Sequence, residues 1–149
     1  MSFLPRSNND YYAGSHMSAW FLLAAGAFTL VLGGIHFFLP DGGAGLVAPI
    51  DLSTRRDMVV AMFASLGAIQ IAHGLAEMLI SLRYRALTPL MLSLVLLERG
   101  LMAFDVWLGK GARSGSHPPE HFASLVVVAL SVWFLGLSLR RRRRSGLSR

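Results

Sequence analysis

The chain has 149 residues, of which 54% are hydrophobic and only 15% are charged, and its mean hydropathy is +0.53. A water-soluble domain of this length is seldom so apolar, so the composition argues against that class. The chain has no cysteine, which excludes disulfides, thiolate metal sites and cysteine nucleophiles.

The apolar residues gather into four blocks of about 18 to 25 residues, the length that a helix needs to cross a hydrocarbon core about 30 Å thick. The sequence therefore predicts an all-α fold, an integral membrane four-helix bundle with four transmembrane helices. We expect these spans at residues 19–39, 55–82, 87–108 and 122–139. A polar N-terminal segment, 1–18, precedes this domain, 19–139, and a basic tail, 140–149, follows it.

Turn and capping residues set the ends of these spans. The Pro-Asp-Gly-Gly sequence at 40–43 ends the first span, and Pro89 fits the first turn of the third. Thr54 and Asp57 stand three residues apart before an apolar run, which predicts a capping box at the start of the second span. Because residues 83–85 form a very short connection, we expect the second and third spans to be antiparallel neighbours.

The orientation follows from counting Lys and Arg on each side of the expected spans. Four lie on one side, namely Arg55, Arg56, Lys110 and Arg113. Nine lie on the side of the two termini, namely Arg6, Arg83, Arg85 and the six arginines of the tail. We therefore expect a multi-pass protein of a bacterial inner membrane with both termini cytoplasmic. The tail is expected to contact anionic lipid head groups and not nucleic acid.

The second and third spans carry polar side chains, although a charge at mid-bilayer costs about 2.5 to 3.5 kcal/mol. At about 100° per residue, Gln70, His73 and Glu77 fall within about 60° of one another on one helix face. Glu98 and Asp105 fall within about 20° of each other on a face of the third span. Each of these two spans is therefore expected to have one polar stripe.

The short turn at Tyr84 sets which residues of the two spans lie at equal depth. In an antiparallel pair folded about Tyr84, residue numbers at equal depth sum to about 169 or 170. Gln70 is then level with Arg99, and His73 is nearly level with Glu98. We expect the two stripes to meet and to form a polar seam.

Further ionisable groups extend this seam in depth. His36 of the first span and Asp105 lie roughly 10 Å outward of the centre, and Glu77 lies a similar distance inward. The polar residues would then form a ladder at three depths. Besides His73 and Glu98, the candidate binding residues are Gln70, Glu77, Asp105 and His36.

The ladder has more than one interpretation. In a structural one, Arg99 pairs with a carboxylate while Gln70 and His73 donate across the helix interface and fix packing. In a second, a lipidic substrate enters sideways, His73 and Glu98 act as an acid/base pair, and Arg99 stabilises an anion. A proton or ion conduit is a third. The candidate catalytic side chains are therefore His73, Glu98 and Arg99.

A metal site is a fourth interpretation. The nitrogen and oxygen ligands on offer are those of His36, His73, Glu77, Glu98 and Asp105. No HExxH or ExxH motif is present, and Arg99 would repel a cation. We therefore expect neither a metal nor another cofactor.

Small residues predict where helices approach closely. Helix pairs in membranes often meet at small residues that recur every four positions. Such stripes occur in the first and second spans, at Ala25, Thr29 and Gly33 and at Ala64, Ala68 and Ala72.

The stretch Arg83 to Met91, followed by Leu96 to Arg99, resembles the hairpin of small four-helix bacterial membrane proteins that are similar in length and plan to DoxX-like proteins. The resemblance implies a four-helix bundle and makes Glu98 a position to test, but it implies no substrate or active site. Sterol-isomerase-like bundles share with this chain only the general chemistry of an intramembrane His and Glu, here His73 and Glu98.

Two functions remain open. In the first, which we favour, the protein is a non-catalytic membrane component such as an accessory subunit, and its seam fixes its own packing or that of a membrane-protein partner or second copy. In the second, it is a small membrane enzyme or carrier that acts on a lipidic substrate through His73, Glu98 and Arg99. A neutral pair of similar shape at Glu98 and Arg99 would retain the first function and abolish the second.

Overall fold

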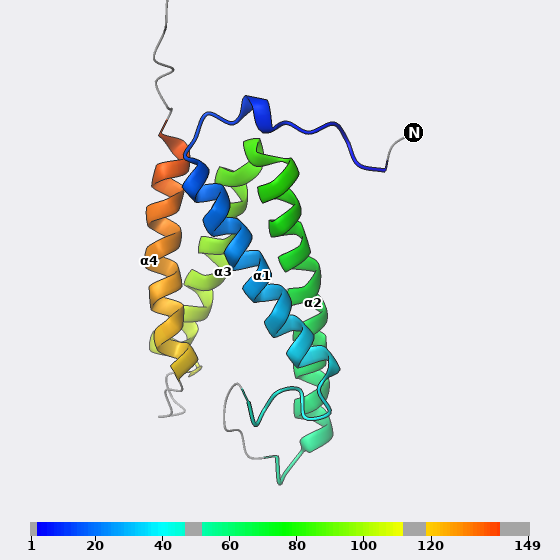
Figure 1. Cartoon of the computed structure of the whole chain (residues 1–149). Coiled ribbons are helices and arrows are strands. Elements are labelled where there is room, and N and C mark those ends of the chain that lie inside the picture. Colours follow the sequence, from blue (N-terminus) through cyan, green and yellow to red (C-terminus); the bar gives the residue numbers. More distant parts are fainter. Residues whose placement is uncertain (1–2, 47–51, 112–118, 141–149) are drawn as a thin grey trace, which may run out of the picture.

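The computed structural model describes residues 3–46, 52–111 and 119–140 and is all-helical in these ranges (Figure 1). Its long helices are α1 (His16–Phe38), α2 (Arg56–Arg83), α3 (Thr88–Leu108) and α4 (Pro119–Leu139). Two short 3-10 helices, η1 (Asn9–Tyr11) and η2 (Arg85–Leu87), accompany them. All four long helices are long and apolar enough to cross a membrane, as the sequence predicted. Arg113 and tail residues 141–149, which entered the orientation count, lie outside the described residues.

The starts of the long helices differ from those predicted by one to three residues. Helix α1 begins at His16 and not at residue 19, because Ser15 is its N-cap and its Oγ accepts a hydrogen bond from the backbone N–H of Met17 at 3.3 Å. Helix α2 begins at Arg56, but the predicted capping box is wrong. Arg55 is the N-cap, its φ of 55° is left-handed, and no side chain caps the helix, so Thr54 does not occupy the capping position.

The four long helices form two pairs, in which α1 packs along α2 and α3 packs along α4 (Figure 1). The pairs meet at the end where α1 begins and α4 finishes. There Phe21 stacks on Phe134 at a centroid distance of 4.4 Å, and Ser18 Oγ donates to the carbonyl oxygen of Phe134 at 2.8 Å. The buried apolar core lies at this end, formed by Leu22, Met91, Leu92 and Val95. Toward the other end the two pairs diverge (Figure 1).

The α2–α3 connection is antiparallel and short, as predicted, but these two helices pack chiefly on other partners. The N-terminal segment lies across their turn and satisfies its backbone groups. Asn9 Oδ1 accepts from the N–H of Arg85 at 3.0 Å, and its Nδ2 donates to the carbonyl of Leu82 at 2.8 Å. The N-terminal segment, the turn and the last turn of α4 therefore lie at one end of the bundle (Figure 1).

Glycines bring α1 and α2 into backbone contact. A Cβ at Gly33 would lie 2.8 Å from the backbone N of Ile71, and one at Gly74 would lie 2.7 Å from that of Leu30. Gly26 and Gly67 are equally close to the opposite backbone. Each helix thus presents two glycines, seven residues or about two turns apart.

The predicted small-residue stripes are therefore correct only in part. In α1, Thr29 and Gly33 are buried as expected, but Ala25 is only partly buried and lines a cavity. In α2, Ala68 and Ala72 are exposed, so the stripe predicted there is wrong. The physical reason is that the backbones approach too closely for any Cβ, so that glycine positions and not alanine positions face the partner helix.

Gly33→Ala is expected to lower the free energy of unfolding by about 1 to 3 kcal/mol, because the new methyl group overlaps the α2 backbone. Gly34→Ala is the matched control, since no heavy atom lies within 4 Å of a Cβ placed there. Both changes raise helix propensity equally. Unfolding titrations in mixed micelles, followed by tryptophan fluorescence, measure the difference. Equal stabilities of the two variants would contradict the backbone contact.

Candidate functional site

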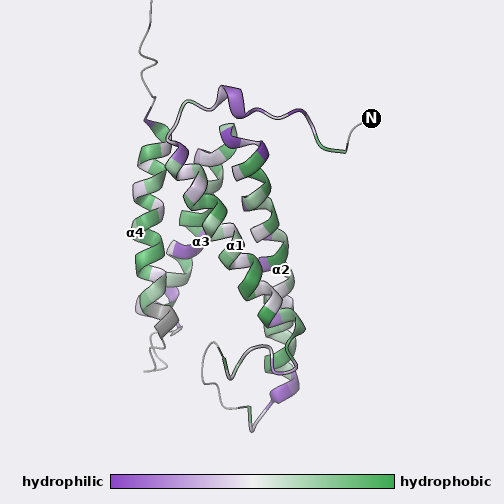
Figure 2. Ribbon diagram, in the orientation of Figure 1, coloured by the Kyte–Doolittle hydropathy of each residue, from purple (hydrophilic) through white to green (hydrophobic). Residues whose placement is uncertain are grey.

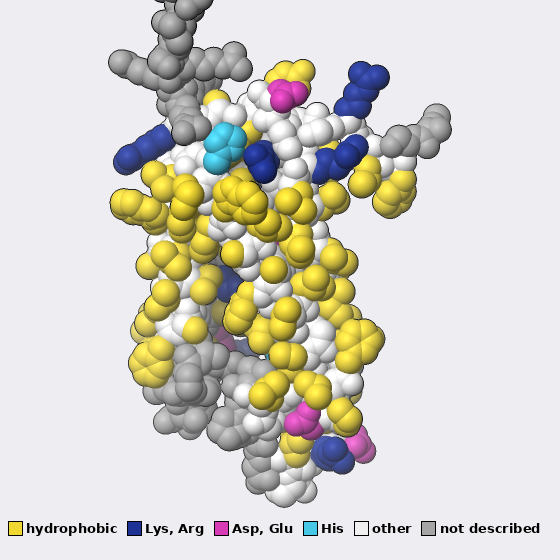
Figure 3. Space-filling view, viewed as in Figure 1, with side chains coloured by type: hydrophobic (Ala, Val, Ile, Leu, Met, Phe, Trp, Pro, Cys, Tyr) yellow, Lys and Arg dark blue, Asp and Glu magenta, His cyan; other side chains and the backbone are white. Residues whose placement is uncertain are grey.

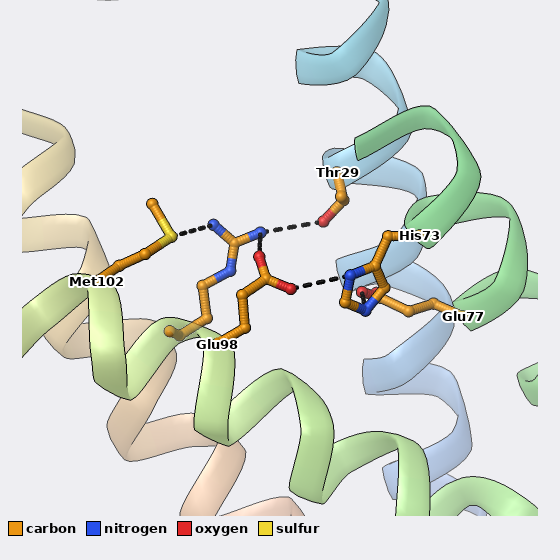
Figure 4. Close-up of polar contacts among 6 residues, drawn as sticks. Thr29, His73, Glu77, Glu98 and Met102 are labelled. Atoms are coloured by element: carbon orange, nitrogen blue, oxygen red, sulfur yellow. Dashed lines mark hydrogen bonds and ion pairs between the residues drawn. The ribbon is translucent and has the colours of Figure 1, made fainter. Parts of the chain in front are cut away.

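A chain of polar contacts crosses the gap between the two helix pairs (Figure 4). His73 Nδ1 on α2 lies 2.9 Å from Glu98 Oε2 on α3. Glu98 Oε1 lies 3.6 Å from Arg99, whose guanidinium also donates to Thr29 Oγ1 on α1 at 3.2 Å. On the other side, His73 Nε2 lies 3.3 Å from Glu77 Oε1. We call these five residues the polar bridge.

The depth of the bridge follows from the α2–α3 turn. His73 lies ten residues before the end of α2 and Glu98 lies ten residues after the start of α3. At a rise of 1.5 Å per residue both are about 15 Å from the turn, close to mid-helix. The expected meeting of the two stripes at this level is confirmed by the His73–Glu98 contact. The His73–Glu98 contact is made by long side chains that cross the gap, and the two helices themselves are not closely packed here.

The contacts constrain where protons lie in the bridge. Glu98 faces both Arg99 and His73 Nδ1, so the imidazole donates its Nδ1 proton to a carboxylate. The other ring nitrogen, Nε2, is near Glu77 but without the angle of a hydrogen bond.

A cavity of about 560 Å³ lies between the helix pairs. Its walls are mostly apolar and include Phe21, Phe28, Leu32, Leu66 and Val127. Its polar lining side chains are Thr29, His36, Gln70, Glu77, Arg99 and Ser124. Figure 3 shows a hollow in the face between α1 and α4, with basic and acidic atoms visible inside it. The size falls within the range of small-molecule sites.

Two cavity-lining side chains of α2 have an oxygen without a hydrogen-bond partner in the described structure. These atoms are Gln70 Oε1 and Glu77 Oε2. Both residues are buried, with 9% of Gln70 and 1% of Glu77 exposed. They lie two helical turns apart on the face of α2 that the polar stripe predicted. A buried polar atom without a partner costs about 1 to 3 kcal/mol, so this face is suited to a ligand that donates hydrogen bonds.

His36 also lines the cavity, toward the end where the pairs diverge. Its Nδ1 lies 2.8 Å from the carbonyl oxygen of Gly42, and its ring stacks on Phe63 at 5.0 Å. Because a carbonyl only accepts, Nδ1 carries the proton, and in the neutral ring Nε2 is an acceptor.

The loop after α1 positions that carbonyl. Gly42 and Gly43 have positive φ angles of 64° and 79°, which glycine adopts without strain. Asp41 accepts hydrogen bonds from the N–H of Gly43 at 2.9 Å and of Gly45 at 3.1 Å. These bonds, led by the one from Gly45, hold the pKa of Asp41 below its usual range.

The structure brings some of the predicted site residues together and separates others. Gln70, Glu77, His36 and Arg99 share the cavity. His73 and Glu98 contact each other, with 23% and 33% of their side chains exposed, but are not among the described lining residues.

Asp105 lies apart from the expected ladder. It is at the last turn of α3, where its Oδ1 accepts from the N–H of Lys110 at 3.0 Å and so satisfies the backbone beyond the helix. The partner that the sequence did not predict is Thr29, which had been assigned only to helix packing. Its γ-hydroxyl group was the available signal, because a hydroxyl in an apolar span needs a hydrogen-bond partner.

Within the described residues, no group of three or more His, Asp or Glu side chains is arranged as a metal site requires. Comparison of the chain with known protein families, with characterised proteins and with solved structures finds no match. The resemblance of the α2–α3 hairpin to DoxX-like proteins therefore stays a prediction.

Glu98→Gln is expected to lower the free energy of unfolding by about 1 to 3 kcal/mol, because Arg99 is left without its counter-charge. Arg99→Met should have a similar effect. The double variant should lower the free energy of unfolding by less than the sum of the two single changes, since no unpaired charge remains. Unfolding titrations of the four proteins in detergent test this coupling. Strictly additive effects would show that the two side chains do not interact.

Proposed function

We propose that the protein is a multi-pass component of a bacterial inner membrane, with the general plan of DoxX-like proteins, that binds a lipidic ligand without transforming it. The observation that carries the proposal is the apolar cavity between the helix pairs, whose lining residues Gln70 and Glu77 each have a buried oxygen without a described hydrogen-bond partner. An accessory role beside another membrane protein or a second copy is compatible with this function.

The outer surface supports the membrane assignment. Large apolar side chains are exposed along all four helices, including Phe28, Met62, Leu97 and Trp133. Hydrophobic side chains cover much of the face between the two ends of the bundle in Figure 3. Figure 2 shows hydrophilic residues chiefly at the two ends of the bundle. Exposed apolar surface of this extent suits lipid, and the helices satisfy their own backbone groups.

The proposed orientation puts both termini in the cytoplasm. The N-terminal segment, the α2–α3 turn and the last turn of α4 share one end, so Arg6, Arg83, Arg85 and Arg140 lie on the same side. Arg55, Arg56 and Lys110 lie at the other end. The positive-inside rule favours the first end as cytoplasmic when the arginine tail, proposed to contact anionic lipid head groups, is counted with it.

The cavity supports ligand binding because of how it is built. The closely packed α1–α2 pair provides one wall and α3 with α4 provides the other. The hollow between α1 and α4 would open toward the acyl chains if the helices span the bilayer (Figure 3). A ligand with a long apolar part could then enter sideways and place its polar end near Gln70, Glu77 and Arg99.

The polar bridge supports a non-catalytic role. His73 and Glu98 satisfy each other across the gap, and Arg99 ties the same carboxylate to Thr29 of α1. These contacts hold the two helix pairs at a fixed separation. His73 and Glu98, the candidate acid/base pair, are engaged with each other and are not among the described residues that line the cavity.

A second candidate function is acid/base chemistry on a lipidic substrate at His73 and Glu98. It is favoured by their 2.9 Å contact and by the partial exposure of both side chains. The two functions differ in what Glu98→Gln should do. A binding protein would retain ligand when the variant folds, whereas an enzyme would retain ligand and lose turnover.

Single cysteines test the membrane topology, since the natural chain has none. We expect a cysteine at Thr54 to react with a membrane-impermeant maleimide added to intact spheroplasts, and one at Asp10 to react only after lysis. Both positions are exposed in the structure, so burial does not limit labelling. Reaction of both cysteines in intact cells, or of Asp10→Cys alone, would contradict the orientation.

Filling the cavity tests ligand binding. Ala25 lines the cavity, whereas its neighbour Ala24 is exposed on the outer face of α1. Native mass spectrometry of protein purified in mild detergent should show a bound lipidic molecule on wild type and on Ala24→Trp, and at least tenfold less on folded Ala25→Trp. Equal occupancy of the two variants, or an empty wild-type protein, would overturn the proposed function.

A further inference from the structure

We infer that the ligand of this cavity has a neutral, hydroxyl-bearing head group, as in a monoacylglycerol, and not an anionic one. This inference rests on the proposed function, because it concerns the same cavity. It is carried by the hydrogen-bonding groups and the charge balance of the walls.

The unsatisfied groups of the cavity are acceptors. Gln70 Oε1 lacks a donor, and an amide oxygen can only accept. Glu77 Oε2 also lacks a partner, and in the carboxylate form of Glu77 this oxygen is an acceptor. His36 adds a third acceptor, Nε2, toward the wider end. Hydroxyl groups donate to such atoms, whereas a carboxylate or phosphodiester has no proton to give.

The charge of the walls also disfavours an anion. Arg99 is the described basic side chain in the lining, and Glu98 already lies 3.6 Å from it. Since Arg99 already faces Glu98, an added anion would lie close to the Glu77 and Glu98 side chains, with no further Lys or Arg among the described lining residues to pair with it. In a water-poor site such a charge is strongly unfavourable.

Arg99 nevertheless favours an oxygen in the head group. A guanidinium has five N–H donors, and the contacts with Thr29, Glu98 and Met102 leave others for a ligand. A hydroxyl oxygen can accept from Arg99 while its proton is donated to Gln70 or Glu77. A neutral head group that both donates and accepts therefore satisfies both kinds of wall atom at once.

Three probes with the same C18 chain length test the inference on the full chain in detergent. They are 1-monooleoylglycerol, oleate and 1-octadecene, and their occupancy is titrated by native mass spectrometry. We expect monooleoylglycerol to bind at least tenfold more tightly than either of the others. Gln70→Leu should weaken monooleoylglycerol binding about tenfold, because one hydrogen bond to a buried acceptor is lost. The same variant should leave octadecene binding unchanged. Ser65→Ala, on an exposed face of the same helix, is the control and should change neither.

The outcomes separate the inference from the proposed function. If oleate binds as tightly as monooleoylglycerol, the inference of a neutral head group is wrong. If octadecene binds as tightly, the polar atoms of the cavity have no role in binding. In both cases the proposed binding of a lipidic ligand in the cavity is retained. If none of the three probes binds wild type, the proposed function fails as well. The wild-type comparison decides between these outcomes even where Gln70→Leu does not fold.

Discussion

The backbone contact between α1 and α2 determines how the rest of the bundle is arranged. Gly26 and Gly33 meet Gly67 and Gly74 where a Cβ would overlap the opposite main chain, so these helices form one closely packed unit. Helices α3 and α4 form the other, and the described apolar core joins the two units at the end where α1 begins. The gap that remains is crossed by the polar bridge, whose side chains are long enough to keep the units apart without filling the space between them. The cavity follows from this arrangement.

Much of the fold is predictable from the sequence because bilayer thickness fixes the length of an apolar helix, and a short turn fixes the depth of residues on either side of it. This is why the four long apolar helices and the level of His73 and Glu98 agree with the prediction. The packing partners were not. Alanine and glycine look alike as small residues, and only the backbone distance shows that α1 and α2 leave no room for a methyl group.

Local backbone geometry accounts for the other differences. The left-handed Arg55 starts α2 without a capping side chain, a conformation that the sequence of this loop does not specify. Asp105 falls on the predicted stripe, but the end of α3 needs an acceptor for the N–H of Lys110, so its carboxylate is used there. Gln70, Glu77 and His36 were predicted as binding residues from their place on one face. Their common cavity depends on the divergence of the two helix pairs, which the sequence does not specify.

The central claim is that the gap between the helix pairs is an occupied ligand site and not a space that closes in lipid. The most direct measurement is a high-resolution experimental structure of the purified protein in a lipid environment. Our account predicts separated pairs, an intact His73–Glu98 contact, and elongated non-protein density with its polar end beside Gln70 and Glu77. A closed bundle whose own side chains fill the gap, with α1 packed along α4 over their full length, would contradict it.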